Sequence, residues 1–151
     1  MNTQEIIKTE LEVLQADVIT RQQAAGKSVT GKTRDLFSVE NVSIEGGQLW
    51  GAAYAGVLER GRRAGKVPYD FKDILLRWAK VKGISFQNNS DADRWAYFVA
   101  KKIREEGTAL YRSGQTEDIF TTAISEFEDR LAERVSLFYQ MEIQNNIFNI
   151  I

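Results

Sequence analysis

The chain has 151 residues, of which 43% are hydrophobic and 27% charged, and its formal net charge is −1. These values predict one globular domain over residues 1–151 and exclude a chain that binds nucleic acid or membranes through its overall charge. The sequence contains no cysteine and no histidine, which excludes disulfides, thiol nucleophiles, zinc sites built from Cys and His, and His-containing catalytic triads.

The chain begins with a predicted amphipathic helix over residues 3–24. Apolar side chains recur at helical spacing along it, at Ile7, Leu11, Leu14 and Val18. This polar, periodic start is unlike a signal peptide, and no apolar run in the chain has the length of a membrane span. Residues 26–35 are rich in Gly, Ser, Thr and Lys, and we expect them to form a flexible connector.

The stretch GKSVTGKT, Gly26–Thr33, fits the phosphate-binding pattern G-x-x-x-x-G-K-[ST]. That pattern cradles phosphates only where the loop leaves a buried strand and opens a helix. Here a predicted helix precedes the stretch and a predicted hairpin follows it, and no apolar strand ending in Asp follows to hold magnesium. We therefore interpret the stretch as part of the connector, with a nucleotide site around Lys32 as the alternative.

The period of the pattern changes after the connector. β-Branched and aromatic residues predict strands at about 36–45 and 48–53, joined as a hairpin by the Gly46-Gly47 turn. The alternation of apolar residues shifts along the first strand, which suggests a bulge near Asn41.

Helices and loops alternate in the next segment. Residues 54–60 are predicted to form a short helix that ends at Gly61. The basic loop RGRRAGKVP follows, and then a helix that Asp70 caps and that ends at Gly83.

Two further helices complete the chain. The first begins at Ser90–Asp93, which resembles a capping box with Asp in place of Glu, and runs to about Glu106 before Gly107. The second is predicted over residues 117–144 from its apolar positions Phe120, Ile124, Phe127, Leu131, Val135 and Phe138. The fold class is therefore α+β, with several helices on a small antiparallel sheet or hairpin and a long C-terminal amphipathic helix.

Carboxylates occur in close pairs at three places, namely Asp91/Asp93, Glu105/Glu106 and Glu126/Asp129. General acid–base chemistry needs two carboxylates that converge in a pocket with differently shifted pKa values, and nothing in the sequence predicts such convergence. We interpret these residues as caps and solvated helix faces. The sequence thus assigns no catalytic residue, no cofactor-binding residue and no metal ligand, and we expect the protein not to be an enzyme.

Two surfaces are candidates for interfaces. The segment from Glu59 to Lys82 is mostly basic, whereas the segment from Glu117 to Glu133 is mostly acidic. Copies in a closed ring could bring one patch against the other, although an ordinary mixed surface explains the pattern equally well.

The C-terminal tail 145–151 is unusually apolar for a terminus and must fold back or dock on a partner. The candidate interface residues are Arg60, Arg62, Arg63, Lys66, Ile147, Phe148, Ile150 and Ile151.

The middle of the chain resembles a known family. The segment YAGVLERG, Tyr54–Gly61, is similar to the Y-A-x-x-[VL]-E-x-G segment of small bacteriophage tail-completion proteins, also described as tail-terminator or neck proteins. The family then has a loop with proline, a helix with an aromatic residue and K-G at its end, and a helix ending in A-x-x-I-x-x-x-G-T. The matching residues here are Pro68, Trp78, Lys82, Gly83, Ala100, Ile103, Gly107 and Thr108. Arg62 stands where the family usually has Thr, so no role for this loop is carried over.

The resemblance implies a structural virion protein that forms an oligomeric ring at the head–tail junction or the tail end. It implies other phage neck, connector or tail-tube proteins as partners, synthesis in the host bacterial cytoplasm, and no cofactor, catalytic residue or membrane. The alternative is a nucleic-acid-binding accessory protein that uses the basic loop 60–66, including a passing contact with genomic DNA.

Overall fold

The computed structural model describes residues 2–27 and 37–148. Their fold is α+β, as the sequence predicts: helices dominate, and the strands form one two-stranded antiparallel sheet. The elements in chain order are α1 (Thr3–Ala24), β1 (Ser38–Glu40), β2 (Gln48–Trp50), α2 (Ala55–Arg60), α3 (Phe71–Val81), α4 (Asn89–Glu106), α5 (Ala109–Ser113) and α6 (Thr121–Phe148).

Contacts among the described residues gather in two compact units. The α1–α6 unit comprises residues 2–27, 37–53 and 118–148, and the α3–α4 unit comprises residues 54–117. The expectation of a single domain stays a prediction, because two compact units in one chain can still unfold together.

The helix α1 confirms the predicted range 3–24. Asn2 caps it: the Asn2 side chain accepts a hydrogen bond from the Glu5 N–H, and the Glu5 carboxylate accepts one from the Asn2 N–H, both at 2.9 Å. This reciprocal pair is a capping box, which satisfies donors that a helix start leaves without intrahelical partners.

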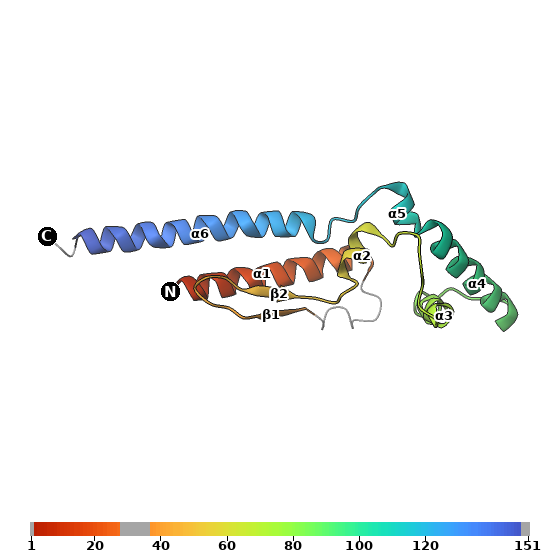
Figure 1. Ribbon diagram of the computed structural model, residues 1–151. Helices are drawn as coiled ribbons and strands as arrows, with labels where there is room; N and C mark the ends of the chain where they lie inside the picture. Colours follow the sequence, from red (N-terminus) through yellow and green to blue (C-terminus); the bar gives the residue numbers. More distant parts are fainter. Residues whose placement is uncertain (1, 28–36, 149–151) are drawn as a thin grey trace. The chain divides into compact units, whose positions relative to one another are not determined.

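The helices α1 and α6 pack side by side and run in opposite directions, and the hairpin lies along α1 (Figure 1). The buried face of α1 supplies most of the apolar core, with Ile6, Ile7, Leu11, Leu14 and Val18. Phe37 at the start of the hairpin is also buried and lies 6.2 Å from the Phe120 ring, between centroids. The sheet therefore adds to the same core as the two helices.

The strands are shorter than predicted, since they cover 38–40 and 48–50 rather than 36–45 and 48–53. Val39 lies opposite Leu49 in the antiparallel register. Asn41 follows β1 with a φ of 52°, a left-handed conformation that Asn tolerates better than most residues. This conformation ends the regular strand at the position where the sequence suggests a bulge, and residues 41–47 form the connecting loop.

The helix α6 begins four residues later than predicted and continues to Phe148. Residues 145–148 are thus the last turn of the helix and not a separate tail, because the sequence contains neither Gly nor Pro from Thr121 to Phe148 to end it. Residues 149–151 lie outside the described part of the chain.

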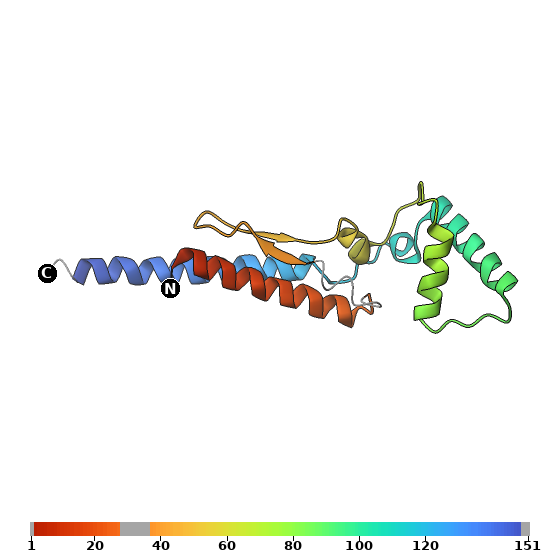
Figure 2. The same ribbon diagram turned by 90° about the horizontal axis from the view of Figure 1, so that it is seen from below.

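In the α3–α4 unit, α3 and α4 pack against each other (Figure 2). Two predicted caps are wrong in detail. Asp70 stands at the N-cap position of α3, but its side chain makes no capping hydrogen bond. The cap of α4 is Asn88, whose side chain accepts from the Asp91 N–H at 2.9 Å, so the helix starts at Asn89 and Ser90–Asp93 is not the capping box. Asn is among the strongest N-cap residues, and it lies three residues before an acidic side chain.

The short helix α5 was not predicted. Thr108 caps it by accepting from the Tyr111 N–H at 3.4 Å, and Gly114 ends it with a left-handed φ of 67°. Among the described residues, no helix combines the length and the apolar content needed to cross a bilayer.

Candidate functional site

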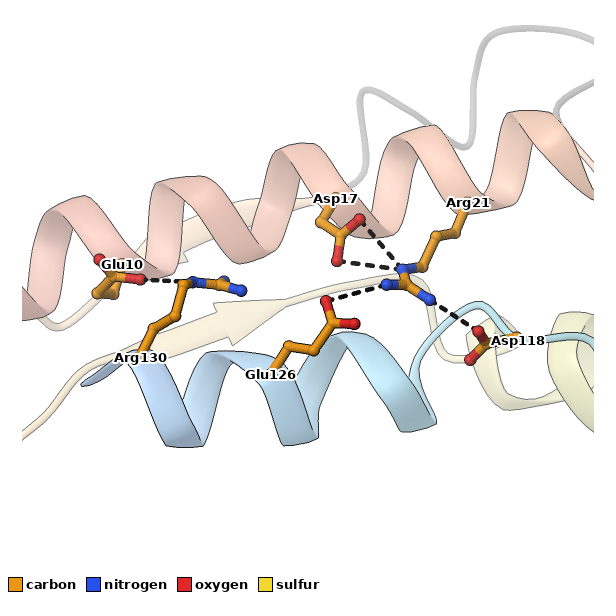
Figure 3. A network of polar contacts seen from close by, with 6 residues as sticks. All are labelled: Glu10, Asp17, Arg21, Asp118, Glu126 and Arg130. Atoms are coloured by element: carbon orange, nitrogen blue, oxygen red, sulfur yellow. Dashed lines mark hydrogen bonds and ion pairs between the residues drawn. The ribbon is translucent and has the colours of Figure 1, made fainter. Parts of the chain in front are cut away.

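Charged side chains hold α1 and α6 together inside the α1–α6 unit (Figure 3). The carboxylate of Glu10 is 3% exposed and accepts from Arg130 Nε at 3.0 Å and from Arg134 Nη1 at 2.6 Å. One buried carboxylate on α1 thus bridges two arginines that lie one turn apart on α6.

A second cluster surrounds Arg21, near the C-terminal end of α1 (Figure 3). Its guanidinium contacts Asp17 on the same helix at 3.1 Å, Asp118 at 2.7 Å and Glu126 on α6 at 3.0 Å. The side chain of Arg21 is 22% exposed, so these contacts are less screened than ordinary surface pairs. The two clusters connect α1 to α6 at two levels, about three helical turns apart along α1.

The environment of these clusters shifts the pKa of their members. Burial raises the pKa of Glu10, but the hydrogen bonds and charges of Arg134 and Arg130 outweigh it, and the net pKa lies below the ordinary value. The pKa of Asp118 is lowered, first by the hydrogen bond from Thr122 and further by the charge of Arg21. Both carboxyl groups therefore favour the ionised form in the folded chain.

The basic loop that follows α2 is held against the junction of α4 and α5. The Arg62 N–H donates to Thr108 Oγ1 at 2.9 Å, and the Thr108 N–H donates back to the Arg62 carbonyl at 2.8 Å. The Gly65 N–H donates to the Arg104 carbonyl at 2.8 Å. A Cβ on Gly107 would lie 2.6 Å from the Arg62 carbonyl oxygen, so the loop backbone passes directly over this glycine.

The side chain of Arg62 belongs to this scaffold. Its Nη2 donates to the Lys66 carbonyl at 2.6 Å, and its guanidinium lies 5.8 Å from the centroid of the Phe71 ring. The other three basic side chains of the loop, Arg60, Arg63 and Lys66, are exposed. All four basic residues line one open hollow of about 720 Å³, together with Tyr111 and the backbone of the loop.

Charge is divided between the two units. Residues 54–117 contain thirteen Lys and Arg against eight Asp and Glu, whereas the rest of the chain contains seven against thirteen. The α3–α4 unit is therefore cationic by five charges, and the remainder is anionic by six. The two unit charges nearly cancel, which is why the net charge of the whole chain is only −1.

The C-terminal end of α6 extends past the first residue of α1 (Figure 1, Figure 2). The Thr3 hydroxyl donates to the Tyr139 hydroxyl at 3.3 Å, which marks the level where α1 begins. Residues 140–148 therefore extend about 13 Å beyond it, at about 1.5 Å per residue. Large apolar side chains are exposed along this end, at Leu137, Met141, Ile143, Ile147 and Phe148. A groove of about 430 Å³ lies beside them, where Ile6 of α1 faces Leu137 and Met141.

The α3–α4 unit also exposes large apolar side chains. Ile74, Trp78 and Val81 recur along α3 at helical spacing and are between 37% and 50% exposed. On α4, Tyr97 and Phe98 are each more than half exposed. An exposed apolar row such as the one on α3 is typical of a protein interaction site.

The structure brings some of the predicted interface residues together and leaves others undescribed. Arg60, Arg62, Arg63 and Lys66 share the hollow, and Ile147 and Phe148 are exposed in the last turn of α6. Ile150 and Ile151 lie outside the described residues, as does most of the GKSVTGKT stretch with Lys32. The hollow and the α6 end lie in different units.

The predicted carboxylate pairs are used in other ways. Asp91 takes part in the α4 cap, Asp93 pairs with Lys72 at 2.9 Å and Glu106 pairs with Arg112 at 2.6 Å. In residues 2–27 and 37–148, no cluster of three or more Asp and Glu side chains is placed to hold a metal ion.

The bridge from Glu10 to Arg130 and Arg134 was not predicted, although the sequence contains a signal for it. Glu10 falls on the apolar face of α1 between Ile7 and Leu11, and the two arginines fall on the apolar face of α6. Charged residues at core positions of two facing helices are rarely buried unless they are paired.

Comparison with protein-family models, with curated proteins and with solved structures finds no significant match to this chain.

Proposed function

We propose that the chain is a structural protein of a tailed bacteriophage virion, and that copies of it assemble head to tail into a ring at the head–tail junction or the tail end. The observation that carries the proposal is the end of α6, where residues 140–148 extend past α1 with Met141, Ile143, Ile147 and Phe148 exposed. A helix end of this kind gains stability when a partner removes its apolar surface from water.

The resemblance to tail-completion proteins supports the location in a virion. Its matched segments follow the helices of the α3–α4 unit: the first motif covers α2 and the final G-T is Gly107-Thr108. In the structure these two motifs are joined, since Thr108 exchanges hydrogen bonds with Arg62 directly after Gly61. The motif residues thus have a shared structural reason to occur in this order.

The partner of the α6 end in this proposal is the α3–α4 unit of the next copy. The α6 end is apolar and carries a single charge, Glu142, between Gln140 and Phe148. The α3–α4 unit offers the exposed row Ile74, Trp78 and Val81 on a cationic body. Apolar surface meets apolar surface, and the anionic unit of one copy meets the cationic unit of the next, which favours this pairing over like-with-like contacts.

A contact between two different surfaces of identical chains is heterologous. It propagates from copy to copy, and it closes into a ring when the rotation between neighbours divides a full turn. A ring is the form that the head–tail junction and the tail end require, because DNA passes through the centre of both.

The test is to charge the apolar end and measure the assembly. We expect wild-type protein to form a single oligomer of defined mass in analytical ultracentrifugation and rings in negative-stain electron microscopy. The double variant Ile147→Glu, Phe148→Glu should remain monomeric with an unchanged far-ultraviolet circular dichroism spectrum, because both side chains are exposed in the single chain.

The matched control is Gln140→Glu, Gln144→Glu, which adds the same two charges to exposed polar positions of the same helix end. This control should still assemble. A wild-type chain that stays monomeric at every concentration and binds no neck, connector or tail-tube protein would overturn the proposal.

A further inference from the structure

We propose that the loop of residues 60–66 binds the sugar–phosphate backbone of nucleic acid without reading its base sequence. This site is separate from the assembly contact at the end of α6, and its argument does not depend on the ring.

Three basic side chains of the loop are accessible to a ligand. Arg60, Arg63 and Lys66 are exposed, and within the described part of the chain none of the three forms an ion pair. Of the acidic residues that flank the loop in sequence, Glu59 is buried, at 4% exposed, and Asp70 lies 4.0 Å from Arg77. Glu106, which precedes the glycine that the loop crosses, pairs with Arg112 at 2.6 Å. Three cations therefore face solvent around one hollow with no counter-charge from their own unit.

Hydrogen bonds within the α3–α4 unit hold the loop in one conformation. Arg62 and Thr108 exchange backbone and hydroxyl hydrogen bonds, and Gly65 is bonded to the carbonyl of Arg104 at the end of α4. The Arg62 side chain closes the loop from within by donating to the Lys66 carbonyl. A loop that is already ordered loses less conformational entropy when it binds, so its cations contribute more of their attraction to affinity.

The shape of the site leaves room for a ligand beside the loop backbone. The hollow of about 720 Å³ is open, and it is lined by the loop, by Gly56 and by Tyr111. No atom lies within 4 Å of the place that a Cβ would take on Gly56 or Gly65, so a ligand can approach the backbone there. Guanidinium groups bind phosphate oxygens through two parallel hydrogen bonds, and such contacts carry no base information.

The charge of the α3–α4 unit favours a nucleic acid over an acidic protein surface. The acidic surface that this chain itself offers is the outer face of α6, with Glu128, Asp129 and Glu133. Duplex DNA carries about one negative charge per 1.7 Å of its axis and binds cationic sites with release of counterions. The excess of five positive charges over residues 54–117 favours the denser polyanion.

The experiment measures binding of the full chain to a fluorescently labelled DNA duplex of mixed sequence between about 50 and 200 mM salt. The loop variant is Arg60→Gln, Arg63→Gln, Lys66→Gln, which leaves Arg62 in its structural role. Its affinity for DNA should fall at least about tenfold. The plot of log K against log salt should also become less steep, with a slope smaller in magnitude by about 2 to 3, because each phosphate contact contributes about 0.9.

The matched control removes three charges from the other end of the α3–α4 pair, as Lys80→Gln, Lys82→Gln, Arg94→Gln. The loop meets this pair at Phe71 and Arg104, where α3 begins and α4 ends, so these three residues lie far from it along both helices. The control should lose less than about threefold, because it changes only the general charge of the unit.

Sedimentation of every variant, and DNA binding in the Ile147→Glu, Phe148→Glu background, separate this site from assembly. Equal losses in the two triple variants, or no binding by wild type at about 50 mM salt, would overturn the proposal. So would a loop variant that binds DNA normally but no longer assembles, because its loop would then pair with the acidic face of another copy.

Discussion

The two units of the chain use their hydrophobic residues in opposite ways. In the α1–α6 unit, Ile6, Leu14 and Val18 are at most 5% exposed. In the α3–α4 unit, the described apolar residues that are fully buried are small, Ala79 and Ala96, while Trp78 and Phe98 remain 44% and 58% exposed. Large apolar side chains are thus buried along α1, whereas among residues 54–117 no large apolar side chain is fully buried.

The charged side chains of the two units also differ, although residues 54–117 contain ion pairs of their own, such as Lys72 with Asp93. The α1–α6 unit pairs Glu10 with two arginines and Arg21 with three carboxylates, whereas the α3–α4 unit leaves Arg60, Arg63 and Lys66 exposed. Paired charges stabilise a specific packing, and unpaired charges attract ligands. The contrast is one of burial, since the Glu10 carboxylate is 3% exposed and the three loop cations are exposed.

The largest expected effect on stability comes from truncating a buried side chain in the core of the α1–α6 unit. Leu14→Ala should lower the free energy of unfolding by about 3 to 4 kcal/mol, because a buried leucine leaves both lost transfer energy and a cavity. Trp78→Ala, on the exposed row of α3, should cost about 1 to 2 kcal/mol although it removes a larger side chain. Guanidinium unfolding followed by circular dichroism measures both, and equal costs would contradict the contrast between the units.

A smaller effect is expected where the α3–α4 unit holds its basic loop. Gly107 and Gly83 both have positive φ, at 84° and 72°, but only a Cβ on Gly107 meets other atoms, with the Arg62 carbonyl oxygen at 2.6 Å. Both alanine substitutions should cost about 1 kcal/mol in backbone strain, and Gly107→Ala about 1 to 2 kcal/mol more.

The difference between the two glycine variants isolates the close approach of the loop, since the strain is common to both. Hydrogen exchange at the Thr108 N–H, which donates to Arg62, should rise in Gly107→Ala alone. Unchanged protection in that variant would show that the loop is not held at this point.

The smallest effect is the dependence of stability on pH. The pKa values of Glu10 and Asp118 are lowered in the folded chain, from ordinary values of 4.5 and 3.8. Their stabilisation is therefore fully present above these ordinary values and is lost as the pH falls below them, when the unfolded chain binds more protons. The thermal midpoint should fall as the pH is lowered below about 4.5, and Glu10→Gln should show a shallower fall.

The sequence predicted the helices well and their ends less well. Strong periodicity defined α1 over 3–24 and placed the long C-terminal helix, because an amphipathic stripe over several turns has no other stable solution. Ends depend on single side chains: Asn88 rather than Ser90 caps α4, and Asn41 ends β1 early through its left-handed φ. At each of these ends, more than one residue could end the element on local grounds, and tertiary packing selects one of them.

The candidate site was predicted in part. The grouping of Arg60, Arg63 and Lys66 follows from a short basic run, so the sequence contained it. The exposure of the α6 end could not be predicted from the sequence, because apolar residues near a terminus can equally well pack against the chain's own core. Pairing of Glu10 with Arg134 joins residues 124 positions apart, a distance over which the helical pattern of either segment gives no register.

That pairing has a geometric consequence. If α6 slid along α1 by one helical turn, about 5.4 Å, either Glu126 or Phe138 would replace one arginine beside the buried carboxylate. The first exchange brings two anions together, and the second leaves a charge facing a benzene ring. The Glu10 bridge therefore determines the register of α6 against α1, and with it the length of α6 that extends past the start of α1.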